Sequence, residues 1–252
     1  MNILVLNSGS SSIKYQLFEM PERTLIAKGV VERIGEAESS MIHTERDDTR
    51  REAVESHDHD EAMAVILGRL MEGNVNEGLG DPGITGPRNE GKQIAAVGHR
   101  VVHGGEAFTG SVLIDNAVLA SIEKSAQLAP LHNPPNLVGI RAAMHALPHA
   151  QQVACFDTAF HATIPQVAYT YALPYELYEK LGVRRYGFQG TSHRYVARRA
   201  AVMLGRDKYD INCITCHLGN GSSITAIRNG RSVDTSMGLT PLEGLVMGTR
   251  CG

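Results

Sequence analysis

The chain opens with Asn2-Ile-Leu-Val-Leu-Asn-Ser-Gly-Ser-Ser-Ser-Ile-Lys-Tyr-Gln-Leu-Phe18, the stretch that decides its fold class. Its apolar first part predicts a strand, the Gly/Ser stretch 8–12 a turn, and the alternating residues 13–18 a second strand. Thr24–Val31, after a turn at Pro21, predicts a third antiparallel strand. An antiparallel meander is therefore expected here.

Helix and strand alternate further along the chain. Ile94–Val97 and Gln152–Phe156 are apolar runs that predict buried strands. Helices are predicted from Asp115, a good N-cap residue, and from Asn133, which Pro134 follows at the first helical position. The order of these elements predicts an α/β fold, with a mixed sheet flanked by helices.

A polar stretch lies between these parts. Residues 44–60 are dense in charge and predict a solvated edge, whereas Glu61–Met71 predicts an amphipathic helix. Residues 73–92 are rich in glycine and have no apolar period, so we expect a mobile surface loop rather than a domain boundary.

The strand–turn–strand pattern returns later in the sequence. A helix is expected from Thr191 or Ser192, and two strands around a second Gly/Ser turn are expected over residues 211–228. Ser222-Ser-Ile224 superposes on Ser11-Ser-Ile13. The repetition indicates an internal duplication.

The composition excludes several classes of protein. The 252 residues carry a formal net charge of -3, which argues against a nucleic-acid footprint or a polybasic membrane patch. No run reaches the ~20 apolar residues that cross a bilayer, and no signal peptide is indicated. Four cysteines are too few for a disulfide framework, so a cytoplasmic location is expected. Cys213 and Cys216, on a predicted strand, are expected to be core residues rather than metal ligands.

Several polar residues lie where a phosphate or carboxylate can bind. The Gly/Ser turns offer backbone N–H groups to phosphate oxygens, although such residues also simply make tight turns. Lys14 follows the first turn within reach of such a phosphate. Arg100, where a strand opens into glycine, suits bidentate capture of an anion or else a surface ion pair. The neighbouring His99 and His103 lack a third ligand for zinc.

Two further residues are candidate ligand contacts. Asp157 ends the second buried strand, where open α/β sheets contact ligands, and it is equally a candidate turn cap. Arg250 is a second arginine near glycines, and like Arg100 it suits bidentate capture of an anion or else a surface ion pair.

These residues lie in blocks that resemble the acetate kinase family. In order, the blocks are Asn7–Lys14, Gly98–Gly105, Pro130–Asn133, Phe156–His161, Arg185–His193, His217–Gly221 and Asp234–Arg250. The resemblance implies a duplicated ribonuclease-H-like fold, as in actin-like ATPases and sugar kinases. It implies an N-terminal domain over 1–160 and, over 161–252, the first part of a second, nucleotide-side domain that is truncated.

The resemblance also implies an activity: reversible, in-line phosphoryl transfer from ATP to acetate, giving acetyl phosphate and ADP with Mg2+ or Mn2+. The catalytic residues are implied to be Asp157, Arg100, Arg250, Gln189 and His132. The acetate pocket is implied to contain Arg100, Val102, Leu131, Phe188 and Pro241. The ATP and phosphate contacts are implied to be Ser10, Ser12, Lys14, His217, Leu218, Gly219, Asn220 and Gly221, with Asn7 at the metal. The full-length protein is implied to be a homodimer, without nucleic-acid or membrane partners.

Two departures from the family pattern bear on activity. Gln189 stands where the family has a histidine thought to stabilise the transition state, and losing one stabilising donor typically costs about 10²–10³ in rate. Family members also continue beyond the position of Gly252, so poor activity is expected of this chain alone. Three alternatives stay open: a kinase for propionate or another short-chain carboxylate, a nucleotide-binding module, and an inactive fragment.

Overall fold

In the computed structural model, which describes residues 1–72 and 93–252, the chain divides into two units. The first comprises Met1–Arg100 and Pro134–Ala154, and the second Val101–Asn133 and Cys155–Gly252. The domain boundary expected at residue 160 stays a prediction, and the loop expected over 73–92 lies outside the described residues.

The first unit is built on the meander that the opening stretch predicts. β1 (Asn2–Ser8), β2 (Ser12–Glu19) and β3 (Thr24–Glu32) pair antiparallel in sequence order. β4 (Ser39–Glu45) and β5 (Asp48–Val54) extend the sheet beyond β3. On the other side of β1 lie β6 (Ile94–Val101), which runs parallel to β1, and β8 (Gln151–Phe156). The sheet is therefore mixed, as predicted, and the charged run forms its exposed outer strand β5.

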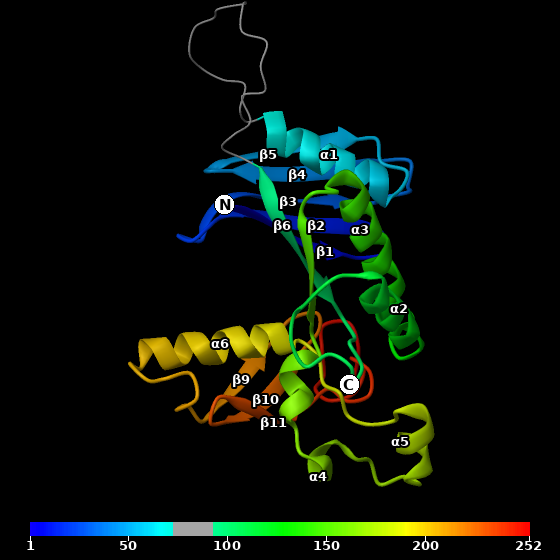
Figure 1. Ribbon diagram of the computed structural model, residues 1–252, viewed down its shortest axis with the longest axis vertical. Helices are drawn as coiled ribbons and strands as arrows, with labels where there is room; N and C mark the ends of the chain where they lie inside the picture. The colour runs from blue at the N-terminus through cyan, green and yellow to red at the C-terminus, as the bar shows by residue number, and fades with distance from the viewer. Residues whose placement is uncertain (73–92) are drawn as a thin grey trace, which may run out of the picture. The chain divides into compact units, whose positions relative to one another are not determined.

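One face of this sheet carries the core of the first unit. Alternation places Leu4, Leu6, Ile13, Tyr15 and Leu17 on that face, each at most 2% exposed. α1 (His59–Glu72) and α3 (Asn133–Ala146) lie along it and contribute to the same apolar cluster (Figure 1). The residues between these core positions, Asn7 and Lys14 among them, belong to the opposite face.

The second unit contains another meander. β9 (Cys213–His217), β10 (Ser223–Arg228) and β11 (Arg231–Thr235) are antiparallel in the order β11-β10-β9, which repeats the order β3-β2-β1. The predicted repetition of the pattern is therefore confirmed. α6 (Gly190–Met203) lies beside these strands (Figure 1) and buries Ala197 and Ala201.

The rest of the second unit consists of short elements. They are β7 (Val112–Leu113), α2 (Asn116–Lys124), α4 (Gln166–Tyr169) and α5 (Glu176–Leu181), with 3₁₀ turns over Ser125–Gln127 and Ala159–Thr163. Asp115 caps α2 as predicted, because its side chain accepts from Val118 N at 2.8 Å. None of the described helices has the length and apolar character needed to span a membrane.

Two local predictions are wrong. α6 begins after Gln189, not at Thr191 or Ser192, because the left-handed conformation of Gln189 places the N-cap two residues earlier. Cys213 is only half-buried and Cys216 is exposed, so they are not core cysteines. Thr215 is the buried residue of β9, so its neighbour Cys216 points to the opposite face, whereas Cys213 shares the face of Thr215 but lies at the start of the strand, where it is only partly covered.

Candidate active site

The first unit brings together three of the predicted site residues. Asn7 and Lys14 lie opposite each other on β1 and β2. Arg100 donates from Nη1 to Asn7 Oδ1 at 3.2 Å. A hollow of about 420 Å³ is lined by Asn7, Lys14 and also Lys28, which sequence reasoning missed. These cationic groups suit an anionic ligand.

The turn between β1 and β2 is fixed by hydrogen bonds. Gly9 N donates to Ser12 O at 2.7 Å. His59, at the start of α1, donates from Nε2 to Gly9 O at 2.8 Å, since a carbonyl oxygen only accepts. Ser10 is exposed on this turn and Ser12 is half-buried. Phosphate binding by these two serines stays a prediction.

In the second unit, two buried histidines lie at the start of α6, and one of them, His161, bonds the turn that leads into it. His161 Nε2 donates to Phe188 O at 3.0 Å. His193 bonds the hydroxyls of Thr215 and Ser223, both at 2.7 Å. Burial lowers the pKa of each histidine to about 4, so both are neutral at pH 7.

Gln189 occupies a strained position in this turn. Its φ of 57° lies in the left-handed region, which costs a non-glycine residue about 1–3 kcal/mol. Gly190 N donates to Asp157 O at 2.9 Å, and any Cβ at position 190 would collide with that oxygen. Such strain persists only where the surroundings enforce it, and it clusters at functional sites. The strained backbone is consistent with the predicted catalytic role of Gln189, which stays a prediction.

A donor, a cation and an apolar group meet at Gly221. A Cβ atom built on Gly221 would lie 2.8 Å from Gln189 Nε2 and 3.3 Å from Arg250 Nη2. The same atom would lie 3.8 Å from Met237 Cε. The absence of a side chain at Gly221 therefore lets these three groups approach one another closely.

Arg250 is held in place by the backbone. Its Nε and Nη2 donate to Pro241 O at 2.9 and 2.8 Å, and its Nη1 donates to Thr249 Oγ1 at 3.0 Å. These three bonds leave two of the five guanidinium N–H groups without a partner among the described residues. Arg250 is therefore oriented by the chain and still able to bind an anion.

The predicted phosphate loop is tied to the segment that carries Arg250. Gly248 N donates to Gly219 O at 3.3 Å, and Thr249 Oγ1 donates to Asn220 O at 3.0 Å. At the start of the loop, His217 Nδ1 bonds the Ser192 hydroxyl at 2.9 Å. Leu218 is exposed. The loop and Arg250 therefore form one hydrogen-bonded substructure.

An apolar cluster adjoins this substructure. Val102 and Phe188, both predicted for the acetate pocket, pack with Met237 and Met247, and each is at most 8% exposed. The methionines were missed, because methionine is an ordinary core residue and nothing in the sequence placed them beside Phe188. Leu131 is 80% exposed and lies outside this buried cluster, so its place in the pocket stays a prediction.

Asp157 and His132 differ in environment. Asp157 is 2% exposed, its N donates to Val101 O at 2.9 Å, and its charge partly offsets the effect of burial on the pKa of His193. His132 is exposed just before α3. Their catalytic roles stay predictions.

The residues present do not by themselves make a divalent-metal site. Residues 1–72 and 93–252 contain no group of three His, Cys, Asp or Glu side chains that could hold a metal ion. Asn7 offers one neutral oxygen, and that oxygen accepts from the Arg100 guanidinium. A cation there would be repelled by the guanidinium, so Asn7 as placed does not form a metal site. The predicted metal contact of Asn7 is left as a prediction.

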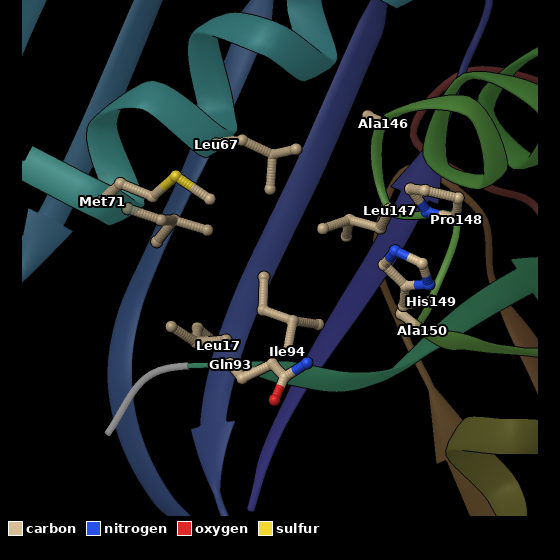
Figure 2. A pocket seen from close by; sticks show the side chains of 11 residues that line it. Leu17, Leu67, Met71, Gln93, Ile94, Ala146, Leu147, Pro148, His149 and Ala150 are labelled. Carbon is tan, nitrogen blue, oxygen red and sulfur yellow. The ribbon is translucent and has the colours of Figure 1, made fainter. Parts of the chain in front are cut away.

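A separate apolar cavity lies in the first unit (Figure 2). It measures about 360 Å³, and Leu67, Met71, Ile94 and Leu147 point into it. Among the described residues that line it, His149 is the single titratable side chain. The described part of this lining holds no arginine or lysine that could bind a phosphate, and it shares no residue with the candidate site.

The positioning role of the buried polar residues was also missed. His161 and His193 belong to blocks that carry the family resemblance, but sequence reasoning gave them no role. Asn133, predicted as a helix start, is fully buried and clamps the backbone of His103: it accepts from His103 N at 3.1 Å and donates to His103 O at 2.9 Å. The signal in the sequence was the presence of these polar residues inside the blocks that resemble the acetate kinase family.

The sequence profile of the Acetokinase family matches residues 2–252. The acetate kinase of Thermotoga maritima is 56% identical over 252 residues, which are 100% of this chain and 60% of that protein. The acetate kinase of Geobacter sulfurreducens is 55% identical over 253 residues, which are 100% of this chain and 58% of that protein. The chain thus spans about 60% of the length of these relatives.

Solved structures give the same result. The Porphyromonas gingivalis acetate kinase matches with a TM-score of 0.88 at 47% identity, covering 100% of this chain and 61% of that one. A propionate kinase from Francisella tularensis matches with a TM-score of 0.88 at 42% identity and the same coverage. The predicted mixed sheet flanked by helices is confirmed by these neighbours.

Proposed function

Because the chain belongs to the acetokinase family, we propose that the protein transfers a phosphoryl group between ATP and a short-chain carboxylate, with acetate as the preferred acceptor. One observation carries the proposal. At Gly221 a single point lies within 4 Å of a neutral hydrogen-bond donor, a guanidinium and an apolar methyl group. An acyl phosphate presents a matching anionic group joined to a small apolar tail.

Each group at this point has a task in the transfer. The acetate carboxylate is ionised at pH 7, so its oxygen attacks the γ-phosphorus without a general base, while the bond from this phosphorus to the β,γ-bridging oxygen breaks and ADP leaves with that oxygen. Arg250 compensates the charge on the transferring phosphoryl group, and the Gln189 NH2 group donates to one of its oxygens. Preorganised donors matter here, because phosphoryl transfer depends chiefly on positioning and charge compensation.

The apolar cluster limits the acyl chain. Val102, Phe188 and Met237 belong to one buried apolar cluster, which suits a small apolar group such as the methyl group of acetate. Methionine side chains are flexible, however, and adapt to ligands of different size. A propionate-accepting enzyme is therefore the second candidate, supported by the 42% identity to a propionate kinase.

ATP with a divalent metal ion, preferably Mg2+, belongs to the same proposal. In the first unit, the residues proposed to face the phosphates are Asn7, Lys14 and Arg100. Arg100 is also proposed to bind the acetate carboxylate. A homodimer and a cytoplasmic location are also proposed. The free state of Cys155, Cys213, Cys216 and Cys251 is consistent with a reducing compartment.

Hydroxylamine trapping of acyl phosphate tests the proposal. The product of the complete gene is incubated with ATP, Mg2+ and acetate, propionate or butyrate, and kcat/KM is compared along this series. We expect acetyl hydroxamate with acetate as the best acceptor and, from residues 1–252 alone, much slower turnover. Absence of hydroxamate with every acid would refute the proposed reaction, and a maximum at propionate would favour the second candidate.

A further inference from the structure

The Gln189 amide ends a chain of hydrogen bonds that runs through the core of the second unit. Thr215 Oγ1 and His193 Nδ1 are 2.7 Å apart, and His193 Nε2 and Ser223 Oγ are also 2.7 Å apart. Ser223 Oγ donates to Gln189 Oε1 at 2.6 Å. His193 and Ser223 are at most 1% exposed, so water does not compete for these bonds.

Donor and acceptor accounting gives this chain one direction. Among the described residues, the Thr215 hydroxyl has no partner other than His193, so its hydrogen must be donated to Nδ1. The imidazole then carries its own hydrogen on Nε2 and donates it to Ser223. Ser223 in turn donates to the Gln189 carbonyl oxygen. The reverse order would leave a buried hydroxyl hydrogen unpaired at Thr215, which costs about 1–3 kcal/mol.

The neutral state of His193 maintains this direction, because an imidazolium would donate at both nitrogens. Burial lowers the pKa of His193 to about 4, and the neighbouring His161 and His217 lower it further, against the opposing charge of Asp157. His193 therefore stays neutral throughout the physiological range.

The hydrogen bond from Ser223 determines which way the NH2 group of the Gln189 amide points. Since the Gln189 oxygen is occupied by Ser223, the NH2 group is the end of the amide that lies against Gly221, beside the Arg250 guanidinium. That NH2 group has no partner among residues 1–72 and 93–252. We propose that Ser223 and His193 are positioning residues, which hold Gln189 with its donor side turned toward the transferring phosphoryl group. The inference deepens the proposed function and rests on it for the identity of the anion.

The tautomer of His193 in the wild-type protein tests the orientation without any turnover. Nitrogen-15 NMR at pH 7 should show a neutral ring with hydrogen on Nε2. Addition of inorganic phosphate should shift the Gln189 side-chain NH2 resonances. The proposal would be overturned by a His193 ring that is charged or carries its hydrogen on Nδ1. It would also be overturned if the Gln189 NH2 resonances did not shift at saturating phosphate.

A double-mutant cycle tests whether Ser223 acts through Gln189. In the complete protein, Ser223→Ala should lower kcat about tenfold to 10²-fold and leave the KM for acetate nearly unchanged. In a Gln189→Ala background the same substitution should have no further effect. Equal losses in both backgrounds would show a merely structural role for Ser223 and overturn the proposal.

Ser39→Ala is the matched control, because Ser39 is likewise buried and loses hydrogen bonds to Arg33 O and Ser56 O, but it lies in the first unit on β4. It should lower thermal stability without changing kcat or the Gln189 resonances. A wild-type protein that forms no acyl phosphate would refute the proposed function, while the His193 tautomer would still decide the positioning.

Discussion

Substitution of Gly221 by alanine probes the point where the three groups meet. The new Cβ would lie 2.8 Å from Gln189 Nε2 and 3.3 Å from Arg250 Nη2. An ordinary contact between such atoms is about 3.5 Å, so the amide would have to retreat by about 0.7 Å. A misplacement of about 1 Å at a reacting centre can cost about 10²-fold in rate. We therefore expect kcat/KM for acetate to fall by between tenfold and about 10²-fold.

The fold should survive this change, because the atoms that the new Cβ meets are the ends of side chains rather than backbone. Thermal unfolding followed by circular dichroism checks stability, and hydroxamate formation gives kcat/KM. Gly110→Ala is the control in the same unit, since a Cβ there would meet nothing within 4 Å. If Gly221→Ala and Gly110→Ala were equally active, Gly221 would not border the reacting groups and the reasoning would be refuted.

Three other predictions concern packing, helix stability and pH. Met237→Ala should destabilise the protein by about 2–5 kcal/mol and raise kcat/KM for butyrate relative to acetate; an unchanged chain-length profile would remove Met237 from the pocket. Gly68→Ala, at an exposed α1 position with open space around it, should raise the free energy of unfolding by about 1 kcal/mol, and an unchanged urea midpoint would contradict this. Burial lowers several histidine pKa values to about 4, so on acidification the unfolded chain binds protons first. This contribution to the free energy of unfolding is complete above about pH 6.5, and between about pH 6.5 and pH 4 each histidine removes up to about 1.4 kcal/mol per pH unit. The histidines concerned are His99, His103, His161 and His193. A urea midpoint that does not change over this pH range would refute their burial.

The opening stretch predicts the first meander because period-two alternation and a Gly/Ser turn are local signals. The strands β4 and β5 were not predicted. In β5 the exposed edge position allows charged residues throughout, so no apolar alternation marks it. The start of α6 was misplaced for a related reason: Thr191 and Ser192 are good caps locally, but the histidine-held turn fixes Gln189 in the left-handed region.

The site illustrates what sequence can and cannot provide. Arg250 and Gln189 were identified through motifs, yet their proximity depends on Gly221, which belongs to a third segment. The positioning chain is harder still to predict, since Thr215 and Ser223 look like ordinary strand residues. Arg100 and Arg250 belong to different units, and their expected convergence on one anion stays a prediction.

A crystal structure of the protein with acetyl phosphate bound tests the central claim most directly. The account predicts phosphoryl oxygens within hydrogen-bonding distance of Gln189 Nε2 and Arg250 Nη2, with the methyl group against Val102 and Phe188. Acetyl phosphate bound at another place, with the Gln189 amide and the Arg250 guanidinium both unengaged, would contradict it.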